Sequence, residues 1–161
     1  MAVSEIIGAA VGVILLVIVA YVVVGSTLIA GETVANSQKD LTIQQEARLR
    51  TSFAITDQYN LTDASILMAN ITNTGTEIIS DFKHMDVIVY DRETGEYEVC
   101  TYDEAGGTAG QWNIANRYDE FIHPYSLDPG EKYLIRVMST KNQPKWFQIT
   151  TANGVYTSAF L

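Results

Sequence analysis

Two asparagines stand in the pattern that accepts an N-linked glycan. Asn60-Leu-Thr62 and Asn70-Ile-Thr72 both match Asn-x-Ser/Thr, and a sequon of this kind is modified only on a chain that passes outside the cytoplasm. In an alternating strand Asn70 lies on the face opposite the apolar side chains, so it points outward. We therefore predict N-glycosylation at Asn60 and Asn70.

Residues for catalysis are sparse. His84 and His123 are the only histidines, 39 positions apart and outside any His-Glu-x-x-His pattern, and the sequence contains neither a Gly-x-Ser-x-Gly elbow nor a phosphate-binding Gly-Lys-Ser/Thr motif. The single Cys100 excludes an intramolecular disulfide and a cysteine-ligated zinc site. We expect no enzyme, no catalytic residue and no cofactor.

Charge narrows the possible partners. The formal net charge is −9, and most of it falls after residue 50. Nucleic-acid binding needs clustered Lys and Arg, which this sequence lacks, so we expect no nucleic-acid partner. Four carboxylates between residues 96 and 104 lack the ordered spacing of a calcium loop, and we predict a solvated acidic surface with no metal.

The N-terminal segment carries the strongest pattern in the sequence. From Ile6 to Gly31 there are 26 consecutive residues without a charge, most of them Ile, Val, Leu or Ala. At 1.5 Å per residue, a helix of this length spans about 39 Å, which is enough to cross a bilayer. Ser4, just before the run, is a good residue to begin the helix.

Three interpretations compete for this segment. A cleavable signal peptide has a basic start and a shorter apolar core, and Met1 to Ser4 contains no Lys or Arg. A single-pass anchor fits the length, but it leaves Glu5 at the edge of the run unexplained. In the third interpretation, a basic leader has been removed immediately before Met1.

The residues Met1-Ala-Val-Ser-Glu-Ile-Ile-Gly resemble the mature N-terminus of archaeal type IV pilins and archaellins. The short uncharged lead, the acidic residue at Glu5 and the long apolar helix carry this resemblance. It implies cleavage by a prepilin-type peptidase immediately before Met1, a membrane-inserted precursor, and assembly into a helical homopolymer. Val3-Ser-Glu-Ile-Ile-Gly8 stands in place of the usual archaellin run and is closer to the general pilin pattern.

Three residues of this segment are candidates for assembly. An ionisable side chain beside an apolar helix is costly unless it is paired, and the resemblance implies that Glu5 pairs with the free α-amino group of a neighbouring subunit. Alternatively, Glu5 only stabilises its own helix N-terminus. Gly8 and Gly12 form a small-xxx-small face that lets two helices approach closely.

The rest of the chain indicates an α+β fold. Residues 32–48 tolerate a helix and contain no Pro, so the apolar helix of residues 1–31 is predicted to continue as a polar extension. From Leu49 the pattern alternates, and Glu104 to Tyr125 looks irregular. Seven short strands separated by turns, such as Asn73-Thr-Gly75 and Asn153-Gly154, predict an antiparallel Ig-like β-sandwich over residues 49–161. Segments 69–75, 85–90 and 127–131 resemble the corresponding strands and turn of archaellins and their accessory proteins.

We therefore predict a structural subunit of an extracellular filament on the archaeal cell surface, an archaellin of the swimming archaellum. Its apolar helix would form the filament core and its sandwich the exterior. Two alternatives stay open: an adhesive archaeal type IV pilin, and a membrane-anchored Ig-like accessory protein that binds the surface layer.

Overall fold

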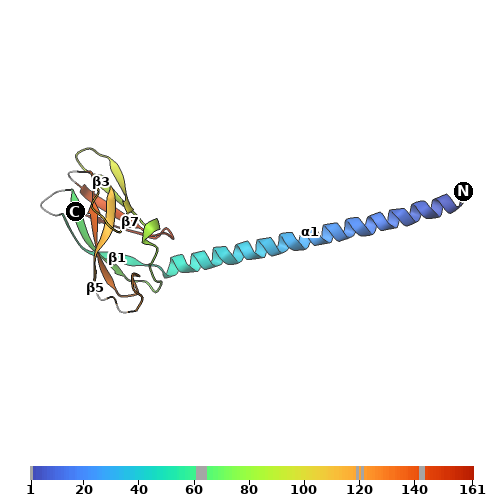
Figure 1. The fold of residues 1–161 in the computed structure, drawn as a ribbon, viewed down its shortest axis with the longest axis horizontal. Helices are drawn as coiled ribbons and strands as arrows, with labels where there is room; N and C mark the ends of the chain where they lie inside the picture. Colours follow the sequence, from blue (N-terminus) through green and yellow to red (C-terminus); the bar gives the residue numbers. More distant parts are fainter. Residues whose placement is uncertain (1, 61–64, 119, 121, 142–143) are drawn as a thin grey trace. The chain divides into compact units, whose positions relative to one another are not determined.

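The computed structural model describes residues 2–60, 65–118, 120, 122–141 and 144–161. The first element is the helix α1, Ala2–Arg50, 49 residues long and drawn in blue to cyan in Figure 1. The polar extension predicted for residues 32–48 is therefore helical. The chain divides into two compact units, Met1–Gln44 and Gln45–Leu161.

The second unit consists of strands and one short 3-10 helix, η1, Phe82–His84. The strands are β1 Phe53–Asn60, β2 Ile66–Asn73, β3 Asp86–Asp91, β4 Tyr97–Tyr102, β5 Gln111–Tyr118, β6 Lys132–Met138, β7 Pro144–Thr150 and β8 Tyr156–Phe160. Turn-forming residues separate them, as the positive φ of Gly95, Gly130 and Gly154 shows.

The strands form one continuous ladder in the order β1-β2-β6-β5-β4-β3-β7-β8. Neighbours pair antiparallel except β4 and β5, which pair parallel through Thr101 with Gln111 and Tyr102 with Trp112. This short parallel pairing joins a first layer, β1, β2, β6 and β5, to a second layer, β4, β3, β7 and β8. The arrangement confirms the predicted α+β fold of a long N-terminal helix followed by an antiparallel sandwich.

One hydrophobic core lies between the two layers. The first layer contributes alternate residues of β2 and β6, and the second contributes alternate residues of β3 and β7. The fully buried members of these four strands are Leu67, Ala69, Ile71, Tyr133, Ile135, Val137, Val87, Val89, Phe147 and Ile149. The period of two in β2 and β6 is the pattern from which the strands were predicted.

The two outermost strands of the ladder also meet each other. The side-chain nitrogen Nε2 of Gln58 in β1 donates a hydrogen bond of 3.0 Å to the carbonyl oxygen of Phe160 in β8. This contact brings the ladder close to a closed barrel.

Two sequence predictions were wrong in detail. The first strand was expected to begin at Leu49, but Leu49 is helical and β1 begins at Phe53. The segment from Glu104 to Tyr125 was expected to be irregular, but it contains β5. That strand shows no clean alternation, because Trp112 and Asn113 are consecutive and both buried.

Candidate assembly site

The apolar part of α1 is exposed along its described length. Its large side chains are exposed throughout; Leu16, for example, is 70% exposed. The helix is long enough to cross a membrane, and it contains an 18-residue stretch with a mean hydropathy of 3.0. An exposed surface of this kind is unfavourable in water, so α1 needs a lipid or protein environment.

The hydroxyl side chains of α1 are compatible with such an environment. Ser26 and Thr27 both donate to the carbonyl oxygen of Val23, at 2.9 and 2.8 Å, and Thr33 donates to the carbonyl of Ile29. Each hydroxyl is satisfied by the preceding turn of its own helix. These residues can therefore be buried against apolar neighbours without leaving a donor unpaired.

The three predicted assembly residues lie along the start of α1. Glu5 is in the first turn of the helix, and Gly8 and Gly12 lie one turn apart on one face. A Cβ added at either glycine would meet no atom within 4 Å. Within one chain the two positions are open, so the structure gives no internal packing reason for glycine there.

The C-terminal end of α1 is held by the turn that follows β2. The carbonyl oxygen of Arg50 accepts hydrogen bonds from the backbone nitrogens of Thr76 and Glu77, at 2.9 and 3.2 Å. The Arg50 side chain contacts Glu77 at 3.7 Å. These contacts satisfy a helix-end carbonyl that would otherwise lack a partner.

Asn73 fixes the shape of this turn from inside the domain. It is 1% exposed, and its Nδ2 donates to the carbonyl oxygens of Glu77 and Leu127, at 2.8 and 2.9 Å. Its Oδ1 accepts from the backbone nitrogen of Gly75 at 3.0 Å. The sequence pattern Asn73-Thr-Gly75 predicted a turn, but it did not predict that this turn would hold the helix.

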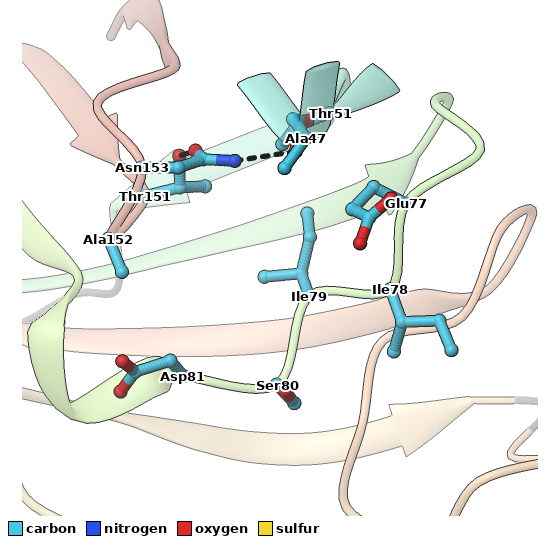
Figure 2. A pocket seen from close by; sticks show the side chains of 10 residues that line it. All are labelled: Ala47, Thr51, Glu77, Ile78, Ile79, Ser80, Asp81, Thr151, Ala152 and Asn153. Atoms are coloured by element: carbon cyan, nitrogen blue, oxygen red, sulfur yellow. Dashed lines mark hydrogen bonds between the residues drawn. The ribbon is translucent and has the colours of Figure 1, made fainter. Parts of the chain in front are cut away.

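The hairpin turn between β7 and β8 contacts the same helix end. Asn153 Nδ2 donates to Thr51 Oγ1 at 2.7 Å, as Figure 2 shows. The hydroxyl of Thr51 in turn lies 2.8 Å from the carbonyl oxygen of Ala47. Two turns that are far apart in the sequence thus converge on the end of α1. We call Arg50, Thr51, Asn73, Gly75 and Asn153 the helix anchor.

A pocket of about 170 Å³ adjoins the helix anchor. Ile78 and Ile79 line it together with the carboxylates Glu77 and Asp81, and Figure 2 shows these side chains from close by. Its mixture of carboxylates and aliphatic side chains forms no catalytic arrangement.

The two sequons differ in their surroundings. Asn70 lies on the outward side of β2, and its Nδ2 donates to Asp57 at 3.2 Å. Asn60 is the last residue of β1, whereas Leu61 and Thr62 of its sequon lie outside the described residues. Glycosylation at both sites stays a prediction.

Both histidines pair with an aspartate. His84 Nδ1 lies 2.7 Å from Asp81 on an exposed surface, and His123 Nδ1 lies 2.9 Å from the buried Asp128. Burial acts to raise the pKa of Asp128, but the hydrogen bonds and the charge of His123 outweigh it and hold this pKa below its usual value. The pair links two residues of the same segment, between β5 and β6.

Other titratable groups have structural surroundings as well. Burial, followed by the nearby Glu98 carboxylate, raises the pKa of the Cys100 thiol to about 12, so the thiol stays protonated and unreactive. Glu98 itself accepts hydrogen bonds from Ser139 and Thr140. Within the described ranges, no group of three or more His, Cys, Asp or Glu is placed to hold a metal ion.

Comparison with solved structures identifies related folds. The archaellum periplasmic stator protein FlaG of Sulfolobus acidocaldarius matches 69% of this chain and 99% of its own, with a TM-score of 0.53 and 20% identity. The archaeal flagellum of Methanospirillum hungatei matches 95% of this chain and 90% of its own, with a TM-score of 0.62 and 15% identity. This chain therefore has the fold of archaellum proteins, which confirms the archaellin-like resemblance at the level of the fold.

A sequence relative defines the family. An uncharacterized protein of Archaeoglobus fulgidus is 32% identical over 147 residues, which cover 90% of this chain and 86% of that protein. The chain belongs to the same family as this archaeal protein. No family model matches the sequence.

Proposed function

We propose that this chain is a structural subunit of an archaellum, an extracellular filament on the archaeal cell surface. Its α1 helices bundle in the filament core, and its β domains form the exterior. The observation that carries this proposal is the uncharged segment of α1 from Ile6 to Gly31, whose large apolar side chains are exposed in a single chain. Copies of the same helix supply a matching apolar surface.

The match to the Methanospirillum filament supports a filament subunit. The helix α1 accounts for 49 of the 161 residues. A match that covers 95% of the chain must therefore include most of α1 as well as the β domain. The proposed role is structural rather than enzymatic.

Before assembly, the same helix would hold the subunit in the membrane. Its length and hydropathy allow this. We propose that a prepilin-type peptidase cuts immediately before Met1 and that the processed helix then leaves the lipid for the filament core. Lipid and neighbouring helices both cover the apolar side chains of α1, so this transfer does not expose them to water.

The stator match favours a second candidate. FlaG is described as an archaellum periplasmic stator protein, and a solved complex contains FlaF and FlaG. As an anchored accessory protein, this chain would occur in few copies, and its β domain would bind another envelope protein. An adhesive pilus subunit is the third possibility. It would also polymerise into a filament, but the filament would serve attachment rather than swimming.

One preparation separates these candidates. Filaments are sheared from cells, purified, imaged by electron microscopy and digested for mass spectrometry. A filament subunit is expected as the dominant peptide source, with a mature N-terminus at or near Met1. Absence of its peptides from the filaments would overturn the proposal. Loss of swimming in a deletion strain, with surface attachment unchanged, assigns the filament to motility.

Glu5 provides a test of the pairing mechanism. If its carboxylate pairs with the α-amino group of the next subunit, Glu5→Ala abolishes filaments while the membrane level of the protein stays normal. Asp at this position retains the charge and is expected to restore part of the assembly. Unaltered assembly of Glu5→Ala would rule out the pairing role and leave only stabilisation of the helix N-terminus.

Glycans at Asn60 and Asn70 would protect the filament exterior. The Asn70 side chain is hydrogen-bonded within the sheet, whereas Asn60 ends its strand. We propose that both acceptors are glycosylated. Intact-mass measurement of Asn60→Gln and Asn70→Gln filaments gives the occupancy of each site.

A further inference from the structure

The outer face of the second layer carries an ordered set of aromatic side chains. The strand register places Tyr97 beside Tyr90, Tyr90 beside Trp146, and Trp146 beside Phe160. These four residues form one row across β4, β3, β7 and β8. All four lie at strand positions that alternate with the buried core residues, so they face away from the core.

The next row on this face is also uncharged. Val99 pairs with Ile88, Ile88 with Gln148, and Gln148 with Ser158. Neither row contains a charged residue. We call these eight residues, Tyr97, Tyr90, Trp146, Phe160, Val99, Ile88, Gln148 and Ser158, the aromatic face.

The aromatic face is exposed and partly rigid. Tyr97 is 67% exposed and Phe160 is 77% exposed. The rings of Tyr90 and Tyr97 are 5.0 Å apart, and those of Tyr97 and Trp146 meet edge to face at 6.4 Å. Aromatic side chains that are already held by their neighbours lose little freedom on binding, and they are the residues that dominate protein interfaces.

Charge indicates which partner this face accepts. Residues 51–161 carry most of the −9 net charge of the chain, so two copies repel each other at most of their surfaces. On the two rows of the aromatic face no carboxylate has to be brought near another or removed from water. A second copy of this chain can therefore approach these two rows at a lower electrostatic cost than it can approach the carboxylate-bearing parts of the domain.

From these observations we infer that the aromatic face packs against the β domain of a second copy of this chain within the polymer. The inference rests on the proposed function, because bundled α1 helices would hold the β domains at a high effective concentration. Under that condition a contact too weak to dimerise free domains is sufficient.

Oxidative footprinting tests this contact with the intact chain. Purified filaments and detergent-solubilised subunits are exposed to hydroxyl radicals, and side-chain oxidation is measured by mass spectrometry. Tyr97 is expected to become at least about fivefold less reactive in the filament, since interface cores exclude water. Tyr125, which is 66% exposed and lies outside the aromatic face, is the matched control. Equal reactivity of Tyr97 in both states, or equal protection of Tyr97 and Tyr125, would overturn the inference.

Substitutions test whether the contact matters. Tyr97→Glu combined with Phe160→Glu places two charges on the aromatic face and is expected to lower the yield of sheared filaments about tenfold, since buried unpaired carboxylates are strongly unfavourable. Ile122→Glu alters a residue of similar exposure, 69%, elsewhere on the domain, and is expected to preserve the yield. Circular dichroism of the detergent-solubilised subunits verifies that the double variant retains its sheet.

The outcomes separate the inference from the function on which it rests. If the unaltered chain is absent from filaments, the proposed function fails, and the inference fails with it. If the unaltered chain forms filaments and the double variant forms them equally well, only the inference fails. A loss of filaments that is confined to the double variant supports both.

Discussion

Among single residues, Gly75 has surroundings that leave no room for a side chain. A Cβ at this position would lie within 2.5 Å of the backbone nitrogen of Ser52 and closer still to the carbonyl oxygen of Arg50. We expect Gly75→Ala to lower the free energy of unfolding by about 2 to 4 kcal/mol, because the backbone of the helix anchor must shift.

Chemical denaturation of the full chain in detergent, followed through tryptophan fluorescence, measures this loss. Gly31→Ala is the matched control, since a Cβ there meets nothing within 4 Å and alanine favours a helix by roughly 1 kcal/mol. If Gly75→Ala unfolds at the same denaturant concentration as Gly31→Ala, the close approach at the helix anchor is not a constraint.

Asp128 makes part of the stability dependent on pH. Because its pKa is lower in the folded state than in the unfolded state, the unfolded chain binds the proton more tightly, and the fold loses stability as the pH falls. The contribution of the ionised Asp128 to the free energy of unfolding is complete above the ordinary aspartate pKa. It disappears as the pH falls through the lower pKa that Asp128 has in the folded state. In Asp128→Asn this part of the acid dependence is expected to be absent.

Urea unfolding midpoints between about pH 6 and pH 2 measure the effect, since the carboxyl titrates within that range. Asp81→Asn is the control: its partner His84 is 77% exposed, so the pair contributes little to stability. A midpoint that falls equally in Asp128→Asn and in the unaltered chain would contradict the role of the buried pair.

At the scale of whole elements, α1 combines an open glycine face with apolar sides. We expect Gly12→Leu to fold and reach the membrane normally, because the site is empty within one chain, yet to assemble poorly because its bulk separates neighbouring helices. Gly12→Ala is expected to assemble. The ratio of filament to membrane protein in sheared cells, measured by immunoblot, is the readout.

Gly25→Leu is the control for added bulk, since position 25 is also open and lies roughly on the opposite side of the helix from position 12 at 3.6 residues per turn. Equal incorporation of Gly12→Leu and Gly25→Leu would show that the face of Gly8 and Gly12 is not a contact.

The elements themselves were largely predictable from sequence. A long uncharged run and regular alternation identified α1, β2, β3 and β6, because a single physical pattern decides each. The end of α1 was missed, since the contacts that extend the helix to Arg50 come from Thr76 and Glu77, 26 and 27 residues away. Local pattern contains no information about such partners.

Local sequence pattern was also insufficient to predict β5 and the aromatic face. β5 has a register shift against β6 between Ile114 and Asn116, and its consecutive residues Trp112 and Asn113 are both buried, so it lacks the alternation of a regular strand. Tyr97, Tyr90, Trp146 and Phe160 each had an outward place in a strand, but only the strand order brings them into one row. Conversely, Glu5, Gly8 and Gly12 were noticed from sequence alone, because an acidic residue at the edge of an uncharged run and two glycines four positions apart are local patterns.

For the whole molecule, charge sets the conditions under which copies can meet. With a net charge of −9 per chain, long-range repulsion between copies is strong at about 0.01 M salt, where the Debye length is near 30 Å, and weak at about 1 M. We expect purified filaments to dissociate more readily at low salt. Sedimentation across a sodium chloride series measures the intact fraction.

Neutral replacements provide the control for this effect. Glu93→Gln together with Glu104→Gln removes two exposed carboxylates and is expected to reduce the salt dependence without altering the β domain. Filaments that are equally stable at all salt concentrations, or that are less stable at high salt, would contradict a repulsive role for the acidic exterior.

The hydrogen bond from Gln58 to the carbonyl of Phe160 has a consequence for crowding. Strand edges with unpaired backbone groups recruit strands from other chains and seed amyloid-like aggregation. Subunits stored in a membrane or stacked in a polymer meet one another continually, which favours such misassembly. This contact occupies one backbone carbonyl at the β8 edge and brings β8 near β1, so less of that edge is open to strands of neighbouring copies.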